Sequence, residues 1–121
     1  EKPMAQNNPR MNVVVQQDVM VVELMSQKIL DEMVISEIGE QLYSLVQKSD
    51  YPRMVVDFSA VSHMSSSALG MLITLQKRIK EKDGILKLCC VQPAIYEVFV
   101  ITRLNEIFDI CGSLEEALKG M

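Results

Sequence analysis

Three consecutive serines, Ser65, Ser66 and Ser67, closely follow His63, the only histidine of the chain. Together with Asp57 upstream, these are the residue types of a serine hydrolase, in which a carboxylate orients an imidazole that activates a hydroxyl. That chemistry needs the three groups to converge in space. His63 shares one tight turn with the serines, and nothing in the sequence directs Asp57 toward it. We therefore predict that the protein is not an enzyme, and we interpret Asp57 as a carboxylate that accepts hydrogen bonds from loop or cap amides.

The serines lie where a strand gives way to a helix. The apolar run 54–58 predicts a buried strand, and apolar residues then return at helical spacing, at Ala68, Leu72, Leu75 and Ile79. The start of a helix presents unpaired N–H groups and the positive end of its dipole. A serine there can cap the helix, and a phosphate there would be stabilised. Both interpretations remain open on the residues alone.

Other chemical sites are not indicated. The five glycines are scattered and form no phosphate-binding loop. With one histidine and no cysteine pair at ligand spacing, we predict no metal and no cofactor. Cys89 and Cys90 are adjacent in an apolar strand, where neighbouring side chains point to opposite faces. We expect them and Cys111 to be reduced core thiols rather than a disulfide framework.

The composition restricts the class of protein. A chain of 121 residues with 49% hydrophobic residues suits one domain with one packed core. The net charge of −4 argues against direct nucleic-acid binding, which needs a basic surface. No apolar run approaches the roughly 20 residues of a membrane span, and no secretion leader is recognisable. We expect a cytoplasmic protein that contacts neither nucleic acid nor membrane.

The first half of the chain contains a predicted hairpin and a helix. Residues 1–10 are polar with two prolines, and we expect a flexible tail. Two β-branched runs, 13–15 and 19–24, predict a β-hairpin. A loop is expected over 27–31. Apolar residues at helical spacing then predict an amphipathic helix, with Ser36 as its candidate cap.

In the second half, strands alternate with helices. After the strand 54–58 come a helix over 66–82, a strand over 85–91, a short helix beginning at Pro93, a strand around 107–109 and a terminal helix capped by Ser113. The order β-β-α-β-α-β-α-β-α predicts an α/β fold. We expect a mixed, mostly parallel sheet of four to five strands with an N-terminal hairpin and with helices packed on it.

The segment 55–70 resembles the signature of STAS domains, the fold of bacterial anti-sigma factor antagonists. In that family an apolar strand ends in Asp-Leu/Phe-Ser and a turn of pattern Asp-Ser-Ser/Thr-Gly/Ala-Leu-Gly opens a helix. The matching residues here run Val-Val-Asp-Phe-Ser-Ala-Val-Ser-His-Met-Ser-Ser-Ser-Ala-Leu-Gly. The resemblance extends over roughly 11–118 and implies a single STAS-type domain over 11–121.

The resemblance implies a switch controlled by phosphorylation. In the family, a partner that is both serine/threonine kinase and anti-sigma factor phosphorylates the first serine after the acid. The unphosphorylated domain binds this partner and frees the sigma factor, so transcription is regulated indirectly. By position that serine is Ser66, with Ser65 and Ser67 as less favoured sites. One departure is that Ser65 stands where the family usually has an acid.

The implied partner surface is the serine-rich turn and the first exposed turns of the following helix, with the Pro93 helix as a neighbour. Its residues are Ser62, His63, Met64, Ser65, Ser66, Ser67 and Met71. We expect a monomer or weak dimer. The missing acid also admits an alternative, in which the domain is not phosphorylated and serves as a signalling scaffold or as a nucleotide- or lipid-binding module.

Overall fold

The N-terminal hairpin lies toward one edge of the sheet in the computed structural model, which describes residues 6–7 and 10–121. Strands β2 (Met11–Gln16) and β3 (Val19–Leu24) pair antiparallel through a two-residue turn, as predicted. Gln17 and Asp18 both have positive φ, 56° and 64°, which suits the twist of a hairpin turn. The range predicted as a flexible tail contains a short strand, β1 (Gln6–Asn7), which pairs with β2; residues 1–5 and 8–9 lie outside the described part.

Parallel strands complete the sheet. They are β5 (Arg53–Asp57), β7 (Ile85–Cys89) and β8 (Asp109–Cys111), and the strand order is β1-β2-β3-β5-β7-β8. Pairs from β3 to β8 are parallel. The predicted mixed, mostly parallel α/β fold is confirmed, with β1 added to five longer strands. β8 begins two residues later than predicted because a 3-10 turn, Leu104–Glu106, precedes it.

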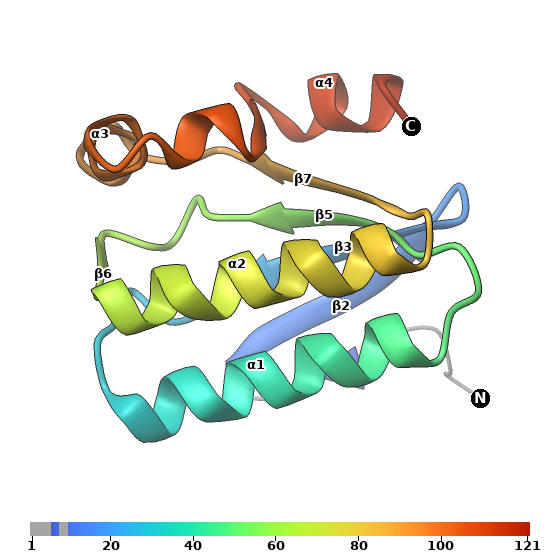
Figure 1. The fold of residues 1–121 in the computed structure, drawn as a ribbon, viewed down its shortest axis with the longest axis horizontal. Helices are drawn as coiled ribbons and strands as arrows, with labels where there is room; N and C mark the ends of the chain where they lie inside the picture. The colour runs from blue at the N-terminus through green and yellow to red at the C-terminus, as the bar shows by residue number, and fades with distance from the viewer. Residues whose placement is uncertain (1–5, 8–9) are drawn as a thin grey trace.

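Two helices cover one face of the sheet side by side, α1 (Glu32–Gln47) and α2 (Ser66–Glu81) (Figure 1). Ser36 does not cap α1. The cap is Asp31, whose Oδ1 accepts a hydrogen bond from the Met33 amide at 2.7 Å. Helices α3 (Pro93–Ile101) and α4 (Leu114–Lys119) follow β7 and β8, and Ser113 caps α4 as predicted. Among the described residues, no helix has the length and hydropathy needed to cross a lipid bilayer.

A second, two-stranded sheet was not predicted. Strand β4 (Lys28–Ile29) pairs in parallel with β6 (His63–Met64), so the expectation of a simple loop over 27–31 is wrong. Such a short pairing leaves no periodic pattern in the sequence, because it depends on a contact between distant segments. It joins the segment before α1 to the segment before α2, and the two helices start at the same end of the molecule (Figure 1).

The core is divided between the two faces of the sheet. The face under α1 and α2 carries the larger cluster, in which Met54, Val56, Leu72 and Leu75 are buried. The other face carries a small cluster whose buried members are Val19, Val21, Val55, Cys89 and Ala117. The predicted inward face of α2 is confirmed, since Ala68, Leu72, Leu75 and Ile79 are all at most 1% exposed.

Candidate functional site

The turn over 62–67, here called the serine turn, is fixed by backbone hydrogen bonds to the segment that precedes α1. The Ser62 amide donates to the Gln27 carbonyl at 2.8 Å, and the Ser65 amide donates to the Ile29 carbonyl at 3.1 Å. Because β4 and β6 pair between these two bonds, both ends of the turn are held. The serine turn is therefore an ordered surface element.

The three consecutive serines have three different roles. Ser65 is the cap of α2, and its Oγ accepts a hydrogen bond from the Ala68 amide at 3.3 Å. Ser67 donates its hydroxyl proton to Glu32 Oε2 of α1 at 2.7 Å. Ser66 is the first residue of α2 and is exposed, and within the described residues its hydroxyl has no hydrogen-bond partner. Of the three hydroxyls, that of Ser66 is the one available to another protein.

The start of α2 is electrostatically suited to an added negative charge. The first turn of α2 contains no acidic residue, so the positive end of its dipole is not offset from within the helix. The Glu32 carboxylate of α1 lies close by, because it accepts a hydrogen bond from the Ser67 hydroxyl. The acid that the family usually places at position 65 is thus absent, and a neighbouring helix supplies one close by.

The residues of a hydrolase are not brought together. His63 is exposed, and its Nδ1 lies 2.9 Å from the Ser62 Oγ. Asp57 Oδ1 accepts a hydrogen bond from the Ser59 amide at 2.8 Å, which confirms its predicted role as a loop-bonding carboxylate. Imidazole, carboxylate and the Ser66 hydroxyl have no hydrogen bonds to one another in the described structure. The described residues therefore do not form a hydrogen-bonded Ser-His-Asp triad at the serine turn.

Met71 does not lie on the exposed surface, contrary to expectation. Its side chain is only 8% exposed and packs toward α1, where a Cβ added to Gly39 would come 3.0 Å from Met71 Cγ. The Tyr43 hydroxyl also donates to the Met71 carbonyl at 3.0 Å. Because α1 covers this side of α2, Met71 is part of the contact between the helices. Met64, on β6, is half-buried.

Two apolar side chains next to the serine turn were missed from the sequence. Leu30 and Met33 are 49% and 74% exposed. Leu30 follows the residue whose carbonyl binds the Ser65 amide, and Met33 follows Glu32, the partner of Ser67. Their signal in the sequence was one apolar residue directly before Asp31 and another two residues after it. They extend the candidate surface from the serine turn onto the start of α1.

The start of α3 also contacts the loop that leads into the serine turn. Gln92 leaves α3 without a side-chain cap, and its Nε2 donates instead to the Ser59 carbonyl at 2.9 Å. Pro93 is the first residue of α3, as predicted, and Tyr96 is 42% exposed on it. The helix expected to neighbour the partner surface is therefore attached to the loop between β5 and the turn.

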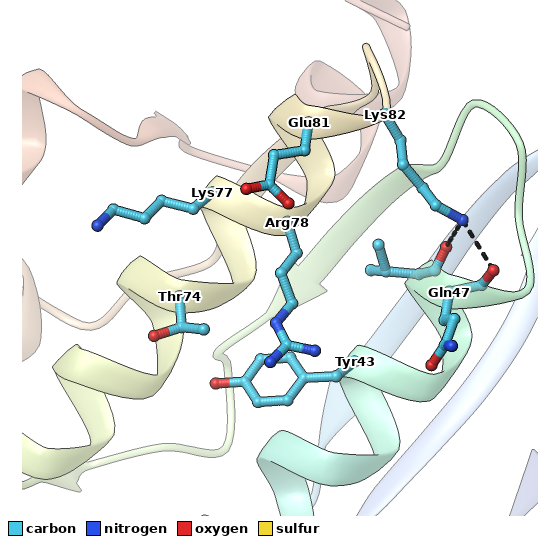
Figure 2. A pocket seen from close by; sticks show the side chains of 8 residues that line it. Tyr43, Gln47, Thr74, Lys77, Arg78, Glu81 and Lys82 are labelled. Carbon is cyan, nitrogen blue, oxygen red and sulfur yellow. Dashed lines mark hydrogen bonds between the residues drawn. The ribbon is translucent and has the colours of Figure 1, made fainter.

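A groove of about 430 Å³ lies between α1 and α2, near their C-terminal ends (Figure 2). Two of the cations that line it, Lys82 and Arg78, have partners within the protein. Lys82 Nζ donates to the carbonyls of Val46, Gln47 and Ser49 at 3.1, 2.7 and 2.7 Å. The Arg78 guanidinium lies 4.3 Å from the centre of the Tyr43 ring. Lys82 thus caps the C-terminal end of α1, and Arg78 stacks on the ring of Tyr43 in α1. Both side chains stabilise the contact between the helices.

Cys89 and Cys90 do not point to opposite faces of the sheet, as the alternation of a strand predicts. Both belong to the cluster under α4, because β7 ends at Cys89 and Cys90 has a φ of 59°. Cys89, Cys90 and Cys111 are free thiols. Burial, the Cys90 thiol and the Asp57 carboxylate raise the pKa of Cys89, and burial and Asp109 raise that of Cys111.

Comparison with known proteins identifies the family. The STAS domain family model matches residues 10–117. BtrV of Bordetella bronchiseptica, named as a candidate anti-sigma factor antagonist, is 30% identical over 81 residues, which are 67% of this chain and 69% of BtrV. An anti-sigma-factor antagonist (STAS) domain protein from Planctomyces limnophilus has a similar structure, with a TM-score of 0.84, 26% identity, and coverage of 92% of this chain and 97% of that one.

The Bacillus cell fate determinant SpoIIAA in its phosphorylated form has a TM-score of 0.69 and 19% identity, over 90% of this chain and 96% of that one. At this identity the likeness concerns the fold alone. The family model matches residues 10–117, which are nearly the whole described chain. The chain belongs to the STAS domain family.

Proposed function

We propose that this protein is an anti-sigma factor antagonist controlled by phosphorylation of Ser66. Unphosphorylated, it binds an anti-sigma factor that is also a serine kinase, through the serine turn and the adjacent Leu30 and Met33. Phosphorylation of Ser66 releases the partner, which then binds its sigma factor. The protein itself catalyses no reaction, contacts no DNA and acts in the cytoplasm, where sigma factors work.

The single observation that carries this proposal is the difference among the three serines. Ser65 and Ser67 are engaged in holding the helix start, whereas the Ser66 hydroxyl is exposed and without a partner in the described structure. A kinase can therefore reach Ser66 without breaking an existing hydrogen bond. Two relatives support the proposal by their names, BtrV as a candidate antagonist and SpoIIAA as an antagonist solved in unphosphorylated and phosphorylated forms.

Phosphorylation at Ser66 is compatible with the fold and unfavourable for a tight complex. A phosphate adds about −1.5 to −2 charges, which the positive end of α2 stabilises. The Glu32 carboxylate lies beside the neighbouring Ser67, so it opposes that charge. A partner packed against the turn would have to bury the phosphate, which is costly without a matching cation. The modification therefore acts on binding more than on stability.

The test compares four baits in pull-downs from native lysate: wild type, Ser66→Ala, Ser66→Asp and the matched control Ser67→Asp. The proposal expects one protein with an ATP-binding serine kinase domain, identified by mass spectrometry, on wild type and on Ser66→Ala but not on Ser66→Asp. That purified protein with ATP must then phosphorylate the wild type at Ser66, read by peptide mapping. Identical captures by wild type, Ser66→Ala and Ser66→Asp would contradict the switch.

The control variant separates position from charge. Ser67→Asp adds the same charge one residue later, where the new carboxylate faces Glu32. It therefore weakens the contact between the helices and leaves the accessible hydroxyl of Ser66 in place. If Ser67→Asp alone loses the partner, the switch residue is Ser67. If none loses it, the scaffold or ligand-binding alternative takes precedence. The groove in Figure 2 would then be the place to test nucleotides or lipid headgroups, although Lys82 and Arg78 are already engaged.

A further inference from the structure

A row of thiols and carboxylates crosses the sheet on the face under α4. Adjacent parallel strands place Glu23 beside Asp57, Asp57 beside Cys89, and Cys89 beside Cys111. In-register residues of neighbouring strands point to the same face. The row lies at the carboxyl ends of β3, β5 and β7, next to the loop that leads from β5 to the serine turn. None of these groups is needed for the proposed switch.

The backbone brings a further thiol into this row at an energetic cost. Regular alternation would turn Cys90 to the opposite face from Cys89. Instead, Cys90 adopts a φ of 59°, and its side chain packs against the same cluster as Cys89. A non-glycine residue in this left-handed region is strained, and such strain is concentrated at functional sites. The strain here has a visible result, which is a pair of neighbouring thiols on one face.

The pair of thiols converges with a carboxylate. The Sγ atoms of Cys89 and Cys90 and a carboxylate oxygen of Asp57 all lie within 4.8 Å of one another. Asp57 Oδ1 is held by the Ser59 amide at 2.8 Å, which orients the carboxylate and leaves its second oxygen available. The Phe58 amide donates to the Cys89 carbonyl at 3.0 Å, so the two strand ends cannot separate easily. Two sulfurs and one oxygen are thus held in a rigid frame.

We propose that Asp57, Cys89 and Cys90 form a binding site for a thiophilic divalent metal ion of the zinc class. Zinc prefers thiolate, imidazole and carboxylate ligands at about 2.0–2.3 Å, so ligand atoms around one ion lie roughly 3.3–3.8 Å apart. The three donor atoms lie within 4.8 Å of one another, so they would have to approach by up to roughly 1–1.5 Å to reach that spacing. Cys89 is fully buried, whereas Asp57 and Cys90 are half-buried and provide the entry path.

The chemistry of binding is simple exchange without redox change. Each thiol loses its proton to solvent as its sulfur binds the ion, and the carboxylate binds as the anion. Three protein ligands leave one coordination position for water. A bound ion would join the carboxyl ends of β5 and β7 and so fix the start of the loop that leads to the serine turn. Metal binding at this site does not depend on phosphorylation of Ser66, so the two proposals can be tested independently.

The test is a titration of the full, reduced and metal-free protein with Co²⁺, followed by competition with Zn²⁺. We expect one ion per chain and the thiolate-to-metal absorption of two coordinating sulfurs. Cys89→Ala and Cys90→Ala should each weaken metal binding by roughly 100-fold or more, because each removes a direct ligand and not a residue that only orients one. Asp57→Asn should weaken it by about tenfold. Cys111→Ala is the matched control: a thiol on the same face, one strand away, whose loss should leave the affinity unchanged.

Alkylation gives a second readout that does not depend on absorption. Bound Zn²⁺ should slow the reaction of Cys90 with iodoacetamide and leave the rate at Cys111 unchanged, read by peptide mass spectrometry. Circular dichroism verifies that each variant is folded; if Cys89→Ala unfolds, Cys90→Ala and Asp57→Asn decide. No thiolate-to-metal band with excess Co²⁺ would overturn the proposal. So would wild-type affinity in both Cys90→Ala and Asp57→Asn, or an equal loss in Cys111→Ala.

Discussion

The two faces of the sheet are built differently. On one face, α1 and α2 bury a broad aliphatic cluster, in which side chains such as Met54, Leu72 and Ile79 are almost completely removed from water. On the other, α4 has only six residues and covers a small cluster in which Cys89 is a buried member. The first face is close to a generic hydrophobic core, whereas the second contains the thiols and, beside them, Asp57.

This difference separates stability from chemistry. The face under α1 and α2 supplies most of the hydrophobic free energy, since that scales with the apolar area buried. It also anchors the serine turn, because both helices start beside it. The thinly covered face can place reactive or polar groups near the surface at little cost to the core. Four experiments test this division, from the largest expected effect to the smallest.

Removing an aliphatic side chain should cost more on the α1 and α2 face. Leu75 is fully buried, so Leu75→Ala should lower the free energy of unfolding by about 3 kcal/mol through lost burial and a new cavity. Leu118 of α4 is only partly buried, and Leu118→Ala should cost about 1 kcal/mol. Urea denaturation measures both. Equal costs would show that the two faces contribute alike.

The thiol face should make the protein sensitive to alkali. Burial raises the pKa of Cys89, so the folded thiol stays protonated at a pH where the unfolded thiol, with a pKa of about 8.5, has ionised. This contribution to stability is complete below that pKa and falls as pH rises above it, by up to about 1.4 kcal/mol per pH unit. Denaturation at several alkaline pH values should show a shallower decline in Cys89→Ala. Parallel declines would contradict it.

Alanine substitutions of Ser65 and Ser66 should differ in their effect on the stability of the protein, because the two hydroxyls differ in hydrogen bonding. Ser65→Ala removes the cap of α2 and should cost about 1 kcal/mol. Ser66→Ala removes a hydroxyl that has no partner in the described structure, so its effect should stay within about 0.5 kcal/mol. The two variants are matched in chemistry and adjacent in sequence. A larger loss for Ser66→Ala, measured by thermal denaturation, would reassign the cap.

The smallest expected effect is the coupling between the helix starts. Ser67 and Glu32 should interact by about 0.5–1 kcal/mol in a double-mutant cycle of Ser67→Ala and Glu32→Gln, since the bond is exposed. The cycle is read from chemical denaturation of the four proteins. A coupling of zero would mean that the bond does not hold the helix starts together.

Much of the fold was predictable because it follows from local periodicity. The hairpin, the buried strand before the serines and the inward face of α2 all have strong repeating patterns over five or more residues. The position of the serines at the start of α2 followed from the same patterns. The choice of Ser65 as the cap, by contrast, depends on backbone angles that the composition of the turn leaves open.

Two of the remaining errors come from contacts between distant segments, and two others are local. Pairing of β4 with β6 involves two residues on each side, too few to show a pattern. Met71 is buried because α1 packs against it, not because of its neighbours in sequence. The turn of Cys90 toward Cys89 results from a single left-handed residue after β7, which no strand pattern predicts. The cap of α1 was a local signal that was missed, since Asp31 is a favoured capping residue directly before the first residue of the helix.

The two ends of the α1 and α2 pair are joined by different bonds. At the C-terminal end, the Lys82 ammonium holds three carbonyls of α1 and its following turn, whereas the serine end has the Ser67 to Glu32 bond. Both sets of bonds are charge-assisted, because the Lys82 ammonium is a cation and the Glu32 carboxylate is an anion. The serine end is also held by the backbone, since β4 pairs with β6 and the Ser65 amide donates to the Ile29 carbonyl. We therefore expect charge added at Ser66 to change the surface of the serine turn and to leave the angle between α1 and α2 unchanged.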